Sequence, residues 1–322
     1  MSTLVGELYG QRLTKKGQMS GKSLDAICPF SKKLCDGGGN RDMARIRSTD
    51  EQLAPLYTYS VSQQADGHFP CGVCSVEQVA KGALWAICPR RLLTFDEQVL
   101  ETEHRSLVLK LLRLAGFQQS EPVDVWSEIT LNERSKQGAT FNYRLDYVLR
   151  SQRAHSPPVI VEVMTCSTSG GNKSKGTDIT AAFKRAVLYA HGSISERPRA
   201  PGVNVRQVWA RMASQMIAKS QAALEWGGRT IWVVQDELAK YIGKQTALPL
   251  EKLRSPDWIP SEVNMVVSDL SNKHELYSGP IRPASSGVPC WTDILGAAHV
   301  PKLESLEAKL EAKVPIARLA LP

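Results

Sequence analysis

The clearest alternation of apolar and polar side chains lies in residues 141–149, FNYRLDYVL. A period of two is typical of a half-buried strand. Asp146 then falls on the face opposite the aromatic residues, where a carboxylate can meet solvent or a metal ion instead of the core. The apolar run at residues 159–164, VIVEVM, predicts a neighbouring strand on which Glu162 and Met164 share one face.

Longer apolar repeats predict helices around these strands. A capping box opens one helix, over residues 94–116, and a second helix covers residues 178–190. A third begins after Asn204 as N-cap, and its exposed face is expected to carry Arg206, Arg211 and Lys219. Residues 229–236 form a further buried strand. Strands interleaved with helices in this way predict a mixed sheet with helices on both sides.

Composition and charge narrow the class of protein. The chain has 322 residues, is 42% hydrophobic and carries a formal net charge of +8, which suits a protein that approaches a polyanion such as a nucleic acid. It contains no apolar run long enough to span a membrane, and its N-terminus lacks the apolar core of a secretory signal. We therefore expect a cytoplasmic protein with no membrane association.

A cluster of cysteines precedes the predicted strands. Five of the seven cysteines lie between residues 28 and 88, beside Pro and Gly, in the segments CPFSKKLC, CGVC and ICPRR. In a reducing compartment such a cluster favours metal ligands over disulfides. The four expected ligands of a structural metal are Cys28, Cys35, Cys74 and Cys88, with Cys71 spare. Four thiolates accept zinc or iron, and ordinary buried thiols are the alternative interpretation.

The acidic residues point to hydrolytic chemistry. Asp146 on one strand and Glu162 on the next, with a third acid, Glu128, one strand earlier in VWSEITL, resemble the PD-(D/E)XK nucleases. In that superfamily such carboxylates bind Mg²⁺. Met164 stands where the superfamily usually has Lys, and a thioether cannot donate a hydrogen bond or carry charge. A lysine from elsewhere is one substitute, and the candidates are Lys173, Lys175 and Lys184.

Several segments together resemble one nuclease family. The elements ICPF, GVCSV, ICPRR, EVMTCSTSGG and WVVQD, within residues 5–242, are similar to the NotI family of type II restriction endonucleases. The resemblance implies a homodimer that cuts both strands of a GC-rich palindrome (CGGCCG-like) in double-stranded DNA. It also implies Mg²⁺ at the carboxylates and a structural iron, with zinc as the alternative, at the four cysteines.

The expected architecture is an α/β fold with two parts. Residues 1–93 form a small N-terminal subdomain around the cysteine metal, and residues 94–322 form a PD-(D/E)XK core, a mixed sheet flanked by helices, with a loop-rich C-terminal recognition segment. Asp146, Glu162, Glu128 and Met164 make up the expected catalytic site. Two alternatives remain open: a DNA-binding metalloprotein without catalysis, and a repair nuclease of the same superfamily that cuts according to DNA structure.

Overall fold

The computed structural model describes most of the chain, in nine stretches. They are residues 3–40, 44–62, 67–134, 140–153, 155–169, 171–245, 250–271, 273–281 and 301–320. The described residues divide into two compact units. The first unit comprises Met1–Thr94 and Thr165–Val208, and the second comprises Phe95–Met164 and Trp209–Pro322. The sequence predicted a boundary between residues 93 and 94. It did not predict that residues 165–208 also belong to the first unit.

The first unit is built on a four-stranded antiparallel sheet in the order β2-β1-β5-β6. Its strands are β1 (Thr3–Leu8), β2 (Gln11–Arg12), β5 (Val73–Gln78) and β6 (Ala83–Ala86). Two short strand pairs accompany it: β3 (Ile46–Arg47) with β4 (His68–Phe69), and β10 (Thr168–Ser169) with β11 (Gly202–Val203). The helices of this unit are α1 (Tyr59–Ser62) and α3 (Ile179–Ala190). Asp178 caps α3 by accepting a hydrogen bond from the Ala181 N–H at 2.8 Å, at the residue where the sequence predicted that the helix begins.

The second unit contains a seven-stranded mixed sheet in the order β14-β13-β12-β9-β8-β7-β15. The strands are β7 (Val123–Arg134), β8 (Thr140–Ser151), β9 (Val159–Met164), β12 (Arg229–Gln235), β13 (Val263–Ser268), β14 (His274–Gly279) and β15 (Ala317–Leu319). Only β12 runs parallel to its neighbours, β9 and β13, while the other pairs are antiparallel. The predicted mixed α/β fold is therefore confirmed.

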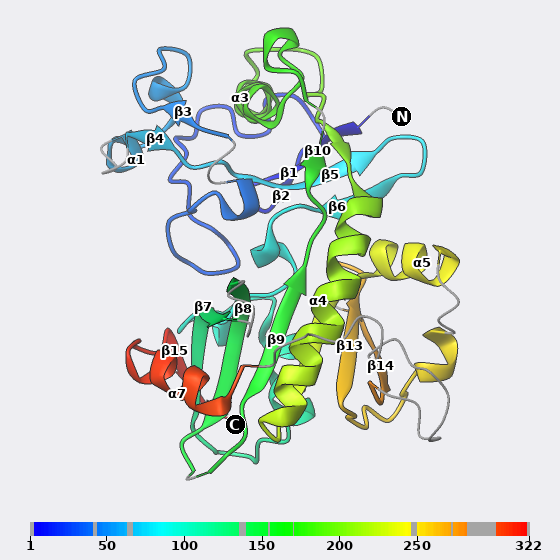
Figure 1. Ribbon diagram of the computed structural model, residues 1–322. Coiled ribbons are helices and arrows are strands. Elements are labelled where there is room, and N and C mark those ends of the chain that lie inside the picture. Colours follow the sequence, from blue (N-terminus) through cyan, green and yellow to red (C-terminus); the bar gives the residue numbers. More distant parts are fainter. Residues whose placement is uncertain are drawn as a thin grey trace. The chain divides into compact units, whose positions relative to one another are not determined.

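Helices cover this sheet (Figure 1). They are α2 (Arg105–Leu114), α4 (Val205–Glu225, which belongs to this unit from Trp209 onward), α5 (Asp236–Gln245) and α7 (Leu303–Glu311). On one face, α4 contributes Ala222 and Ala223, and Trp226 directly after it, to a core that includes Ile160 of β9, and α7 adds Leu306 and Leu310. Among the described residues, no helix has the length and apolar content needed to cross a membrane.

One predicted helix was wrong at its start. The sequence predicted a continuous helix from residue 94, but the chain forms a short 3₁₀ turn at Val99–Glu101 before α2 begins at Arg105. The Thr102 hydroxyl donates to the Val99 carbonyl oxygen at 2.7 Å and accepts from the His104 N–H at 3.2 Å. These local bonds satisfy backbone groups that a continuous helix would otherwise have used.

Candidate active site

The two acids expected at the site lie across from each other on adjacent strands. In the antiparallel pairing of β8 with β9, Tyr147 faces Val161, so the next step along this register sets Asp146 opposite Glu162. Their side chains then bond to the neighbouring backbone. The Asp146 N–H donates to Glu162 Oε1 at 3.3 Å, and the Val163 N–H donates to Asp146 Oδ2 at 2.9 Å. The end of this strand pair therefore holds two carboxyl groups side by side.

Burial controls the protonation of these carboxyl groups. Glu162 is almost completely buried, and its burial, together with the charge of Asp146, raises its pKa to about 8 against the opposing effect of Lys219. Burial also raises the pKa of Asp146, although the Val163 N–H and the charge of Lys219 act in the other direction. Two acids with raised pKa values in one buried place form a site that favours an added cation.

The Lys219 ammonium forms an ion pair with Glu162 Oε2 from helix α4. The lysine side chain is 7% exposed and that of Glu162 is 1% exposed. The sequence placed Lys219 on the solvated face of this helix, and that prediction was wrong. Helical periodicity sorts residues by polarity, so it assigns a lysine to solvent even where the facing strand supplies a buried carboxylate. Arg206 and Arg211 are exposed as predicted.

Glu128 lies beside this pair, but its side chain pairs with a different residue. The register of β7 with β8 places it across from Asp146, since Ser127 faces Tyr147 and Ile129 faces Leu145. Its backbone has a φ of 52°, an uncommon conformation for a residue with a side chain. Its carboxylate is exposed and pairs with Arg144 at 3.1 Å, and its charge acts to raise the pKa of Asp146.

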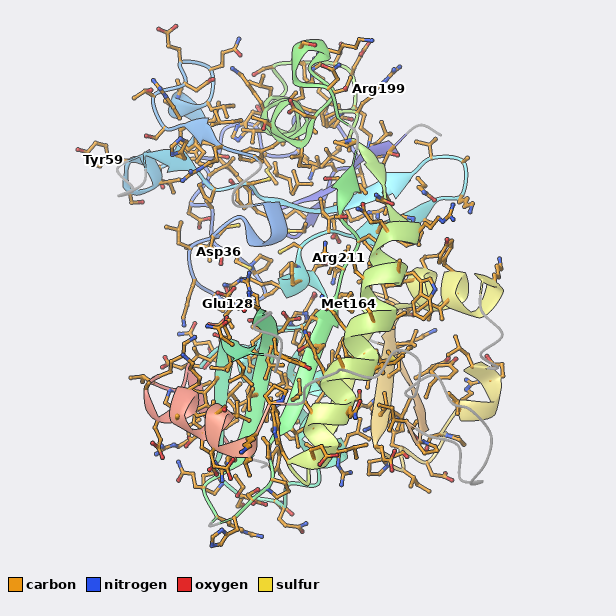
Figure 2. All side chains as sticks on the ribbon, in the orientation of Figure 1. Asp36, Tyr59, Glu128, Met164, Arg199 and Arg211 are labelled. Carbon is orange, nitrogen blue, oxygen red and sulfur yellow. The ribbon has the colours of Figure 1, made fainter. Side chains whose placement is uncertain are left out.

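Met164 ends β9 two residues beyond Glu162 and is half-buried. In Figure 2, the labelled residues Met164 and Glu128 lie at the same edge of the sheet. The lysines that the sequence suggested as substitutes belong to the first unit. Lys184 pairs with Asp50 there at 2.7 Å, Lys175 is exposed, and the side chain of Lys173 lies outside the described residues.

The donor atoms of the acid pair suit a divalent cation in part. Within the described part of the chain, Asp146 Oδ1 accepts no hydrogen bond, and carboxylate oxygens are the ligands that Mg²⁺ prefers. The site has two carboxyl groups and one ammonium group, so it carries a net negative charge when both acids are ionised. No group of three or more His, Cys, Asp or Glu side chains among the described residues is arranged to hold a metal ion.

In the first unit, the four cysteines expected as metal ligands lie together. Cys28, Cys74 and Cys88 form a buried cluster with Phe30, and Cys35 packs against it. Cys71 is buried outside this cluster, and Cys35 Sγ points to its carbonyl oxygen at 3.7 Å.

Backbone N–H groups face two of the sulfurs: Gly10 donates to Cys74 Sγ at 3.3 Å and Gly37 donates to Cys35 Sγ at 3.4 Å. Burial raises the pKa of Cys88 to about 11 and that of Cys74 well above its ordinary value. Burial therefore favours the protonated form of these two thiols. The four sulfurs match the ligand number and type of a tetrahedral ion, but among the described residues they are not arranged around one.

The chain matches no protein-family model and no curated protein. The geometry of the acid pair and of the cysteine cluster therefore provides the argument for function.

Proposed function

We propose that this protein is a Mg²⁺-dependent endodeoxyribonuclease, and specifically a type II restriction endonuclease with a PD-(D/E)XK core. The observation that carries the proposal is the reciprocal bonding of Asp146 and Glu162. Each carboxyl group accepts a hydrogen bond from the other strand, at 3.3 Å and 2.9 Å, and both lie at one end of adjacent strands. Two neighbouring acids of this kind support a site for one ion, which metal-assisted hydrolysis of a phosphodiester uses.

In the proposed reaction, the chain's own residues would hold the metal ion and orient the carboxylates that bind it. The Val163 N–H holds Asp146 Oδ2, so that the second oxygen of this carboxylate is directed to the ion. Glu162 would supply the second carboxylate, and Glu128, whose exposed side chain pairs with Arg144, is the candidate for a third. Bound Mg²⁺ would lower the pKa of a water molecule and offset the charge that builds on the phosphorane. In-line attack of water on phosphorus would break the P–O3′ bond and leave a 5′ phosphate and a 3′ hydroxyl.

The proposed substrate is double-stranded DNA with a GC-rich palindromic site, cut by a homodimer. The net charge of +8 supports a polyanionic substrate, and the family resemblance supports the GC-rich site and the dimer. Guanine is read most often by Arg or Lys in the major groove. Part of the expected recognition segment, residues 282–300, lies outside the described residues.

The cysteine cluster is proposed to hold a structural metal. Cys28, Cys35, Cys74 and Cys88 are the proposed ligands of an iron ion, and zinc is the alternative. Metal analysis of the purified protein by mass spectrometry would identify the ion. We assign the cluster a structural role and no part in bond breaking.

The decisive experiment is a digest of a GC-rich plasmid with Mg²⁺, with and without chelator, followed by sequencing of the ends. We expect discrete fragments with 5′ phosphates in the presence of Mg²⁺ only. Asp146→Asn and Glu162→Gln should each lower the cleavage rate by about 100-fold or more. Asp124→Asn is the matched control, because this acid lies on β7 of the same sheet and pairs with Arg318 at the surface.

Two other results would change the assignment. A smear of fragments, lost in Asp146→Asn, would favour a nuclease that cuts according to DNA structure or ends. Tight DNA binding without Mg²⁺-dependent cleavage, unaffected by Asp146→Asn or Glu162→Gln, would favour the DNA-binding metalloprotein and would contradict the proposed function.

A further inference from the structure

We propose that Lys219, on helix α4, replaces the lysine that is missing from position 164 and acts as the positioning residue of the acid pair. This inference rests on the proposed function of that pair. The sequence pattern would place the charged group on strand β9, whereas Lys219 lies on helix α4. The observation behind it is the ion pair between the Lys219 ammonium and Glu162 Oε2.

The fold explains why a helix residue arrives at this place. Ile160 and Glu162 lie on one face of β9, since side chains two residues apart on a strand share a face. Ile160 packs in the core to which α4 contributes Ala222 and Ala223. Lys219 precedes these two residues by one helical turn, and Glu162 follows Ile160 by one strand repeat. The helix therefore sets Lys219 above Glu162.

Stability alone does not explain this pair. A buried ion pair loses much of its Coulombic gain to desolvation, and apolar residues of similar volume often stabilise a protein as well or better. The ammonium also lies 5.8 Å from the centre of the Trp232 ring, which is fully buried, so the pair is held away from water. A lysine kept in such surroundings is better explained by a role at the carboxylates.

The charge of Lys219 lies at the acid pair. Its ammonium contacts Glu162, and the other oxygen of that carboxyl group accepts from the Asp146 N–H at 3.3 Å. With both acids ionised, the lysine leaves a site of net charge −1, which a divalent cation would convert to +1. The role of Lys219 is to hold the Glu162 carboxylate against Asp146 and to set this charge balance.

The position on β9 offers an exchange experiment. Met164 lies on the same face of the strand as Glu162, so Met164→Lys places an ammonium beside the same carboxylate. Lys219→Met removes the charge from α4 with little change in side-chain volume. The double variant, K219M with M164K, moves the ammonium from the helix to the strand and leaves the total charge unchanged.

For cleavage of the GC-rich plasmid, we expect K219M to be slower than the parent by about 100-fold and the double variant to recover at least tenfold of that loss. Lys240→Met, which removes an exposed lysine paired with Asp236 and Glu237 on α5, is the control and should leave the rate unchanged. Parent-like cleavage by K219M, or no recovery in a folded double variant, would overturn the inference.

A second measurement does not depend on activity. Calorimetry with Mn²⁺ alone reports whether the carboxylates are held in place for a cation, because a ligand that loses its positioning partner binds the metal more weakly. We expect K219M to bind Mn²⁺ about tenfold more weakly than the parent, M164K more weakly as well because of its added positive charge, and the double variant like the parent. Equal affinities in all four proteins would overturn the inference.

Thermal unfolding of each variant shows whether it is folded. Should K219M unfold early, Lys219→Gln, which keeps a hydrogen-bond donor for Glu162 but not the charge, takes its place in both measurements.

The two measurements distinguish this inference from the proposed function. A parent protein that binds Mn²⁺ at the acid pair in this order of variants, yet leaves DNA intact, would refute the proposed nuclease function and not the role of Lys219. If the parent and K219M cleave DNA equally well, the role of Lys219 is refuted and the proposed nuclease function stands.

Discussion

His274, on the edge strand β14, is a residue whose burial gives the protein a dependence on pH. Burial, with a smaller contribution from the charge of Lys110, lowers the pKa of the imidazole to about 4. Its Nδ1 is buried and has no hydrogen-bond partner among the described residues. The folded protein therefore favours the neutral ring, while the unfolded chain binds a proton at the ordinary pKa of about 6.5.

This difference predicts that acid weakens the fold. Between pH 6.5 and about 4 the unfolded chain binds more protons than the folded protein, so the free energy of unfolding falls as the pH falls through this range. Because the ring is partly exposed, we expect a loss of about 1–2 kcal/mol from this residue. Urea unfolding at pH 8 and pH 5 measures it. In His274→Gln the difference between the two pH values should shrink, and an unchanged difference would contradict the prediction.

The acid pair shows what residue patterns can and cannot predict. Alternation along two strands placed Asp146 and Glu162 on faces that can meet, because the period of a strand is a local property. Lys219 was missed because its partner lies 57 residues away, and only the packing of α4 on β9 brings the two together. Similarly, a strand pattern located Glu128 but did not reveal its left-handed backbone or its pairing with Arg144.

At the scale of elements, regular segments were predicted well and loops were not. The strands β8, β9 and β12 and the helices α3 and α4 follow from apolar periodicity, and the start of α4 also from the cap Asn204. The cysteine segment contains little regular structure, and its conformation depends on turns between the ligand candidates. Clustering in the sequence predicted that the cysteines gather, but the return of residues 165–208 to this unit carried no local signal.

A glycine in the cysteine segment provides a test of this packing. A Cβ atom at Gly38 would lie 2.5 Å from Cys88 Sγ, and the residue has a φ of +49°. Gly38→Ala must therefore displace the sulfur as well as accept an unfavourable backbone conformation. Gly21→Ala is the matched control, because Gly21 also has a positive φ, of +76°, but its Cβ would meet nothing within 4 Å.

We expect G38A to lower the free energy of unfolding by about 1–3 kcal/mol more than G21A does, the usual range for overpacking a buried site. If the four cysteines bind metal, G38A should also reduce the metal content of the purified protein. Chemical unfolding and mass spectrometry measure the two effects. Equal destabilisation by the two variants would show that Cys88 moves aside without cost.

For the whole molecule, a net charge of +8 predicts binding to DNA that weakens with salt, but the total does not say which groups contribute. The first unit has a cleft lined by Arg45, Arg47 and Lys184 as well as by Asp50 and Asp178. Both acids are engaged, because Asp50 pairs with Lys184 and Asp178 caps α3. Arg45 and Arg47 are exposed and have no ion-pair partner among the described residues, so both are available to phosphates.

The double substitution Arg45→Ala with Arg47→Ala should therefore weaken DNA binding in a particular way. Removing one arginine–phosphate interaction lowers the slope of log affinity against log salt by about 0.9, so a fall of nearly 2 is expected, equal for GC-rich and unrelated duplexes. Fluorescence anisotropy with Ca²⁺ in place of Mg²⁺ measures binding without cleavage. The double variant Arg254→Ala with Arg318→Ala changes the total charge equally but removes arginines already paired with Glu275 and Asp124. A similar decrease of slope in that control would show that total charge, and not the cleft, governs binding.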